Sequence, residues 1–519
     1  MLAGELQGKS QRERIMQSMF SVCPLLLLAS AVVAAEQRAS SAAAAGAMTY
    51  RIEWSTLIGG SQYDDLREII VGDDGTLLVG GMAMSPDMPI TEGALQPTYA
   101  GDRAGTGHPG LVGGDCYLAR LSPDGRRILA ATYFGGSKQE RDVYGMALDR
   151  QGDIVITTTT RSPDIATTPG TFQRKYAGGI NEVVVAKLSA DLRKVLWCTY
   201  LGGSDSESPR GGLAIDPDDC VYVVGVTQSK DFPTTPGTLQ PARAGDDDAF
   251  VAKLKPDGSG LAWCTLLGGS GREMIIGARV DAKGRVYVTG YTYSADFPVS
   301  RNAAQRRPGG ECDAFLAALA PDASRLLFCT RLGGKGVEFP EHRMALLGDG
   351  SMILTGVTRS PDFPTTPGVF QRQLRGKNAG FVTRLSPDGS RFVFSTFLGG
   401  SGGEFLLMPT LDGRGTIYLV GHTASNDFPV TPGALQKTYG GGDDGVFAVL
   451  SPDGSQLLYA TYLGGKGEDL LRSIALGRDG SVYLIGKTAS DDFPVTFGAA
   501  QTTRHGGLDS FVVKLVPAP

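Results

Sequence analysis

The stretch from Arg391 to Val420 reads RFVFSTFLGGSGGEFLLMPTLDGRGTIYLV and covers most of one repeating unit. It contains an alternating apolar and polar segment, a Gly399-Gly400 pair, a second apolar segment, an Asp412-Gly413-Arg414-Gly415 turn and a third apolar segment. A fourth segment, Val446 to Leu450, follows a longer connection. β-Branched and aromatic residues bounded by Gly, Pro and Asp are typical of strands and their turns. The unit is therefore predicted to hold four antiparallel strands.

The Gly-Gly pair recurs along the chain at nearly constant spacing. Its first residues are Gly59, Gly135, Gly202, Gly268, Gly333, Gly399 and Gly464. The first spacing is longer than the others because of a Gly-rich insertion near Asp102 to Gly113. Repeats of this kind indicate supersecondary units that stack on copies of themselves. Seven units of four strands predict an all-β fold, a seven-bladed β-propeller of four-stranded antiparallel blades.

The two ends of the repeat region are complementary. Ile52 to Ile58 (IEWSTLI) is a strand without its usual preceding hairpin partner, and Phe511 to Leu515 (FVVKL) lacks the strand that normally follows. We expect the N-terminal strand to pair in the last blade, because this closes the ring and leaves no open sheet edge. A linear array would instead show polar capping units.

The residues before the repeats have the layout of a secretory signal peptide. Lys9, Arg12 and Arg14 precede a short apolar run from Pro24 to Val33, and small residues follow it. We therefore expect residues 1–35 to be a signal peptide and 36–49 a low-complexity spacer. The propeller is expected at 50–515 and a short tail at 516–519. The protein is expected to be exported to the periplasm, the cell surface or the extracellular space, without a transmembrane segment after signal removal.

Composition excludes two classes of protein. Of 519 residues, 41% are hydrophobic and 20% are charged, which is enough apolar material for a large core and excludes a disordered chain. The net charge of −5 argues against a nucleic-acid binder, which needs a basic surface to displace counterions from phosphates.

At this point the units resemble a known family, the bacterial seven-bladed beta-propeller (SBBP) repeat. The residues that carry the resemblance are Tyr200-Leu201-Gly202-Gly203-Ser204, Val221 to Thr227 and Ser229-Lys230-Asp231-Phe232-Pro233. The resemblance extends over about residues 50–515. It implies an exported or cell-surface bacterial protein, but it supplies no reaction and no catalytic residues.

An acid stands five positions after the first Gly of every pair. These acids are Asp64, Glu140, Glu207, Glu273, Glu338, Glu404 and Asp469. A ring of carboxylates near the axis could hold a cation such as Ca²⁺, which prefers oxygen ligands. Bracing of a local turn is the favoured interpretation, because five of these acids follow a Ser at capping-box spacing and arginines such as Arg210 and Arg472 lie close by as counter-charges.

Other recurring polar residues are also interpreted as braces. They are the Asp of each Ser-x-Asp, the Gln that follows it within one connection, and an Asp before the third strand, such as Asp248. The Asp246-Asp247-Asp248 cluster lacks the spacing of an EF-hand loop. Six Cys follow the signal segment and are expected to be buried free thiols. The four His fall at different registers, which predicts no His-based metal site.

Two functions remain open. The first is a monomeric, non-enzymatic binding scaffold that takes a protein or glycan ligand on the face carrying the long connections. Its contacts would come from the off-pattern residues Arg103, His108, Arg301, Arg306 and Arg307. The second is a polysaccharide lyase or hydrolase that uses acids around the axial pocket. The sequence favours the scaffold and predicts no catalytic residue.

Overall fold

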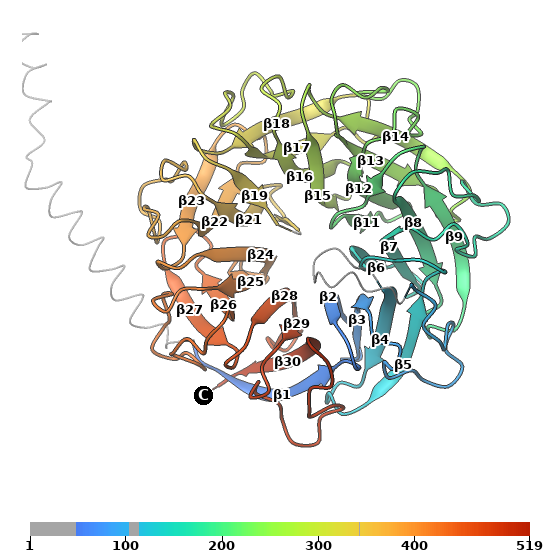
Figure 1. Cartoon of the computed structure of the whole chain (residues 1–519). Helices are drawn as coiled ribbons and strands as arrows, with labels where there is room; N and C mark the ends of the chain where they lie inside the picture. Colours follow the sequence, from blue (N-terminus) through green and yellow to red (C-terminus); the bar gives the residue numbers. More distant parts are fainter. Residues whose placement is uncertain (1–47, 103–113, 342, 519) are drawn as a thin grey trace, which may run out of the picture. The chain divides into compact units, whose positions relative to one another are not determined.

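A computed structural model describes residues 48–102, 114–341 and 343–518. These residues form seven antiparallel β-sheets arranged as the blades of a ring (Figure 1). The sequence prediction of an all-β, seven-bladed propeller is confirmed. No helix long and apolar enough to cross a membrane occurs in the part of the chain that the structure describes.

The strands fall into four sets according to their place in the blade. The innermost strands are β2 (Asp64–Val71), β6 (Gly145–Leu148), β10 (Glu207–Ser208) with β11 (Leu213–Ile215), β15 (Glu273–Val280), β19 (Glu338–Pro340) with β20 (Ala345–Leu346), β24 (Glu404–Leu411) and β28 (Asp469–Leu476). The second strands are β3 (Leu77–Ala83), β7 (Ile154–Thr160), β12 (Val221–Thr227), β16 (Val286–Thr292), β21 (Met352–Thr358), β25 (Ile417–Thr423) and β29 (Val482–Thr488).

The outer half of each blade is equally regular. The third strands are β4 (Asp115–Leu121), β8 (Glu182–Leu188), β13 (Asp248–Leu254), β17 (Asp313–Leu319), β22 (Ala379–Leu385), β26 (Asp444–Leu450) and β30 (Asp509–Pro517). The outermost strands are β5 (Ile128–Phe134), β9 (Val195–Leu201), β14 (Leu261–Leu267), β18 (Leu326–Leu332), β23 (Phe392–Leu398), β27 (Leu457–Leu463) and β1 (Tyr50–Ile58). We number the blades 1 to 7 from the blade of β2 to the blade of β28.

Blade 7 contains strands from both ends of the repeat region. Its order is β1-β30-β29-β28, and β1 pairs antiparallel with β30 from Tyr50 opposite Pro517 to Ile58 opposite Ser510. β30 runs to Pro517, two residues beyond the expected end, and the Ala518 amide donates to the Thr49 carbonyl (2.9 Å). This pairing leaves the outer edge of β30 covered.

The core lies between neighbouring blades. One cluster of buried side chains joins Val185 and Trp197 of blade 2 to Val223 and Ala252 of blade 3, and Phe232 of the Ser-x-Asp-Phe-Pro segment packs into it. The cysteines among the described residues are free: Cys220 is half-buried and Cys116, Cys198, Cys264, Cys312 and Cys329 are buried. The prediction of buried free thiols is confirmed for five of the six, whereas Cys220 is free but only half-buried.

Each blade presents different connections at its two ends. The two tight hairpins, before the second strand and before the fourth, lie at one end of the blade. The Gly-Gly loops and the long connections between the second and third strands lie at the other end, where they contact each other: the Ser61 amide donates to Asp87 (2.9 Å). We call this end the long-loop face.

Candidate functional site: the axial pocket

The recurring acids of the innermost strands are buried and brace their own loops. In every blade the amide of the second Gly of the pair donates to the carboxylate, as from Gly60 to Asp64 at 2.8 Å. A hydroxyl near the end of the second strand donates as well, as from Thr160 to Glu140 at 2.6 Å. Local bracing is what the sequence favoured, and the structure shows its partners.

The capping-box interpretation of these acids is wrong. The Ser that precedes the acid bonds instead to the Ser-x-Asp segment: Ser61 donates its amide and its hydroxyl to Asp87. Asp64 itself accepts a hydrogen bond from the amide of Gly60, the residue that precedes Ser61. No helix begins at this point, so there is no helix N-terminus to cap, and the Gly-Gly loop bonds instead to the long connection between β3 and β4.

The other recurring polar residues also hold loops in place. The Gln side chains bridge the long connection to the Gly-Gly loop: Gln96 accepts from the Gly135 amide (2.9 Å) and donates to Asp115 (2.7 Å). Asp248 accepts from the Ala244 amide, and Asp247 pairs with Arg272 (3.4 Å). In blade 2 the bracing acid is Glu182, which lies opposite Thr160 as Asp248 lies opposite Thr227; the sequence pattern of recurring Asp did not include it.

The described residues contain no group of three or more His, Cys, Asp or Glu side chains arranged to hold a metal ion. The predicted cation-site acids are each hydrogen-bonded within their own blade, and the structure does not bring them together. Of the predicted contact residues, Arg301, Arg306 and Arg307 are exposed on the connection between β16 and β17. Arg103 and His108 lie outside the described residues.

A β-bulge in four of the innermost strands leaves one residue of each strand outside the ladder. In β2, β15, β24 and β28 the register shifts around Arg67, Ile276, Leu407 and Arg472, so each of these residues has no partner in the ladder. In blades 3 and 5 the innermost strand is interrupted at the equivalent residues, Arg210 and Glu341. Bulges bend a strand and re-aim a side chain. All of these residues stand eight positions after the first Gly of the pair.

A glycine in the second strand makes room for the bulge. A Cβ at Gly81 would lie 2.2 Å from the Asp65 carbonyl oxygen, and one at Gly290 would lie 1.9 Å from that of Met274. This close approach of two backbones explains why the repeat has Gly here. In blade 2, Thr158 takes the position and β6 begins only at Gly145.

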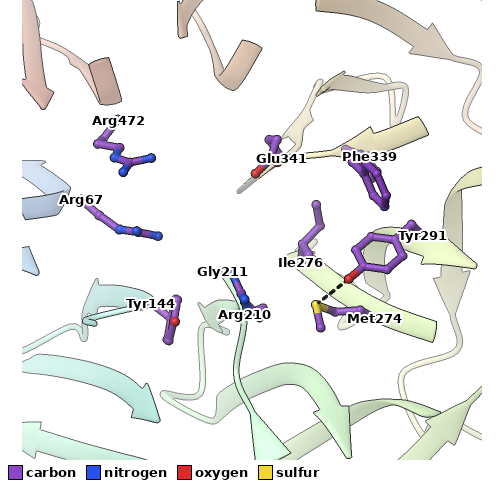
Figure 2. A pocket seen from close by; sticks show the side chains of 11 residues that line it. Arg67, Tyr144, Arg210, Gly211, Met274, Ile276, Tyr291, Phe339, Glu341 and Arg472 are labelled. Carbon is purple, nitrogen blue, oxygen red and sulfur yellow. Dashed lines mark hydrogen bonds between the residues drawn. The ribbon is translucent and has the colours of Figure 1, made fainter. Parts of the chain in front are cut away.

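The residues named at the eighth position, except Leu407, help to line a pocket of about 320 Å³ on the axis (Figure 2). Its lining consists of Arg67, Tyr144, Arg210, Gly211, Met274, Ile276, Tyr291, Phe339, Pro340, Glu341 and Arg472. Most of them belong to the half of the innermost strand that starts at the Gly-Gly loop. Arg67 and Arg472 lie on one side, and Phe339, Tyr291 and Met274 lie on the other (Figure 2).

Buried ion pairs hold the basic side of the pocket. Asp65 is fully buried and accepts from Arg472 (2.9 Å) and Arg67 (3.3 Å), and Arg67 also pairs with Asp142 (3.3 Å). Burial opposes ionisation of Asp65, but the two guanidiniums hold its pKa well below the ordinary value. Burial raises the pKa of Asp142 to about 6, against the effect of Arg67.

The sequence interpretation of two arginines is corrected here. Arg210 and Arg472 do not neutralise the recurring acids of their own blades; they face the axial pocket, and Arg472 pairs with Asp65 of blade 1. The sequence feature that could have indicated these pocket residues is the eighth position after the first Gly of each pair. The residue type at this position differs from blade to blade, whereas the fifth position is always acidic. A position that breaks the symmetry of a repeat is a candidate for function.

No protein-family model matches this sequence, and no curated protein is similar enough to count as a relative. Solved structures align over most of the chain. BamB from Moraxella catarrhalis is 12% identical and covers 87% of this chain and 99% of its own, with a TM-score of 0.36. A protein of unknown function from Dyadobacter fermentans is 10% identical and covers 91% of this chain and 100% of its own, at 0.41. A europium-containing methanol dehydrogenase is 11% identical and covers 90% of this chain and 93% of its own, at 0.37.

Similarities this distant carry no function to this chain. The class of protein is defined by the strand pairing itself, which makes it a seven-bladed β-propeller with a polar axial pocket.

Proposed function

We propose that the protein is an exported, non-enzymatic binding scaffold built from SBBP-type repeats. It takes a protein or glycan partner on the long-loop face. The observation that carries this proposal is that recurring polar residues and variable residues have different roles in the blades. The positions that recur in the blades brace loops, and the positions that differ between blades are exposed or face the axis. Variable side chains on a rigid frame are what a specific binding surface needs.

The connection between β16 and β17 is the candidate contact surface. It carries Arg301, Arg306 and Arg307, all exposed and without an ion pair to any described residue. Arg side chains are favoured at interfaces because the planar guanidinium makes several hydrogen bonds at once. Export is supported by the signal-like layout of residues 1–35.

The enzyme alternative has less support. A lyase or hydrolase of this kind needs two acidic groups, or an acid and a base, around one substrate. Glu341 is the one carboxylate in the described lining of the axial pocket. The nearby Asp65 and Asp142 form ion pairs with Arg67.

The test is capture of partners from an envelope extract and binding to a glycan array by the immobilised full chain. We expect a variant with Arg301, Arg306 and Arg307 all changed to Ala to lose at least fivefold in capture at an unchanged melting temperature. The matched control changes Arg126 and Arg127 to Ala, since this exposed pair lies on the opposite face, in the hairpin between β4 and β5. No specific capture by the unaltered chain, or equal losses in both variants, would contradict the proposal.

A further inference from the structure

The basic side of the axial pocket has hydrogen-bond donors left over. Arg67 donates from Nη2 to Asp65, and its Nε forms an ion pair with Asp142 at 3.3 Å without a hydrogen bond. Arg472 donates from Nε and Nη2 to Asp65. Neither Nη1 group donates to any described residue. The ion pairs fix the planes of both guanidiniums, and both side chains extend toward the pocket (Figure 2). Fixed, partly unused guanidiniums are suited to a planar anion such as a carboxylate.

Arg210 adds a third cation to the lining, and its charge acts to lower the pKa of Glu341. It lies between β10 and β11, is exposed, and makes no ion pair with the residues that the structure describes. Its guanidinium lies 5.8 Å from the centre of the Tyr144 ring, a distance at which a cation–π interaction helps to hold it. Tyr144 is itself buried, so the platform under Arg210 is fixed.

The opposite side is apolar and aromatic. The rings of Tyr291 and Phe339 meet edge to face, with centroids 5.2 Å apart and planes at 87°. The Tyr291 hydroxyl donates to the sulfur of Met274 (3.3 Å), and Ile276 completes this wall (Figure 2). Tyr291 and Phe339 are half-buried, so part of each ring faces the open pocket. These contacts fix an apolar surface opposite Arg67 and Arg472 (Figure 2).

The remaining acid weakens the basic character of the pocket only in part. Burial raises the pKa of Glu341, whereas Arg210, Arg472 and Arg67 act to lower it. Asp65 and Asp142 already offset part of the charge of Arg67 and Arg472, so an anion in the pocket gains chiefly from Arg210 and from the Nη1 groups of the other two arginines. The volume of about 320 Å³ lies at the lower end of the range for small-molecule sites.

We infer that the axial pocket binds a small organic carboxylate with a flat apolar body. Its carboxylate lies against Arg67, Arg210 and Arg472, and its body lies against Tyr291, Phe339 and Met274. This site goes beyond the proposed scaffold role, which concerns a macromolecular partner on the long-loop face.

The probe for this inference is 4-hydroxybenzoate, titrated calorimetrically into the full chain. The uncharged 4-hydroxybenzyl alcohol and inorganic phosphate serve as separate arms. We expect saturable binding of the benzoate, with at least tenfold weaker binding of the alcohol and of phosphate. Arg210→Ala and Phe339→Ala are each expected to weaken benzoate binding at least tenfold. Arg272→Ala is the matched control, because Arg272 is exposed and paired with Asp247 outside the pocket.

Two outcomes would overturn the inference. One is the absence of saturable benzoate binding by the unaltered chain. The other is binding of phosphate as tight as that of benzoate with no loss in Phe339→Ala, which would make the site one for inorganic anions. The scaffold proposal is tested separately, since capture of a partner depends on Arg301, Arg306 and Arg307. A chain that captures a partner but binds no benzoate refutes only the pocket, and the reverse result refutes only the scaffold.

Discussion

Glu68 of blade 1 and Arg343 of blade 5 form an ion pair although their blades are not neighbours in the ring. Glu68 follows the bulge of β2, and Arg343 lies in the gap between β19 and β20. Their side chains are 7% and 13% exposed. Because the blades lie apart in the ring, this pair joins two blades across the axis.

This pair is expected to stabilise the ring only while both partners are present. Burial raises the pKa of Glu68, and Arg343, followed by Arg279 and Arg67, acts to lower it, so removing Arg343 leaves a buried acid without its hydrogen-bonded partner. Arg343→Ala should cost about 3 kcal/mol of unfolding free energy. The measurement is chemical denaturation of the full chain.

A double-mutant cycle separates the interaction energy between Glu68 and Arg343 from the effect of removing each side chain. The variant with both Glu68→Leu and Arg343→Leu should be less destabilised than the sum of the two single changes, since neither charge is then left alone. Additive losses would show that the two residues do not depend on each other.

The glycines opposite the bulges are expected to tolerate no side chain. In Gly290→Ala the new Cβ would lie 1.9 Å from the Met274 carbonyl oxygen, so the bulge that carries Ile276 must shift. We expect a loss of about 2 kcal/mol in stability. Gly348→Ala is the control, because a Cβ there meets no atom within 4 Å. Equal melting temperatures for the two variants would contradict the close-approach explanation.

Much of the fold was predictable from the sequence, whereas the pocket was not. The number and order of strands follow from the Gly-Gly pair and the alternating segments, because these are local patterns that recur in all seven units. Arg472 faces the pocket because of the bulge in β28, and Arg210 faces it because the innermost strand of blade 3 is interrupted. Neither feature can be read from the sequence around the eighth residue after the first Gly of the pair. The Glu68–Arg343 pair depends on ring closure, and no local pattern reports a contact between blades that are not neighbours.

Stability is expected to fall as the pH rises from about 5 to 8. Burial raises the pKa of Asp64 to about 6 and that of Glu140 to about 7. Acids in the unfolded chain titrate near pH 4, so the folded state binds more protons across this interval. The stabilisation from these groups is therefore present below about pH 4 and is lost as the pH passes through the folded-state values. Melting temperatures in buffers of equal ionic strength measure the effect.

Two variants assign this pH dependence to buried acids. Glu140→Gln removes one titrating group and should flatten the decline between pH 5 and 8. Asp388→Asn should leave the decline unchanged, because hydrogen bonds from Ser386 and Ser390 lower the pKa of this exposed acid to about 2. A melting temperature that stays level or rises over this interval in the unaltered chain would count against the raised pKa values.

β1 is expected to be essential for the fold, because it covers the edge of β30 and joins blade 7 to both neighbouring blades. The Trp54 indole donates to the Pro123 carbonyl of blade 1 (3.0 Å), and the Tyr50 ring packs on Phe447 and Tyr459 of blade 6. Deleting residues 50–58 removes these contacts and exposes a long unpaired strand edge, which promotes aggregation. We expect loss of the cooperative thermal transition measured by circular dichroism, whereas a control lacking only residues 1–47 should melt like the full chain. Adding a peptide of residues 49–58 should restore part of the transition, since the missing strand can then pair with β30. A deletion variant that melts cooperatively at the temperature of the control would show that the ring is stable without this strand.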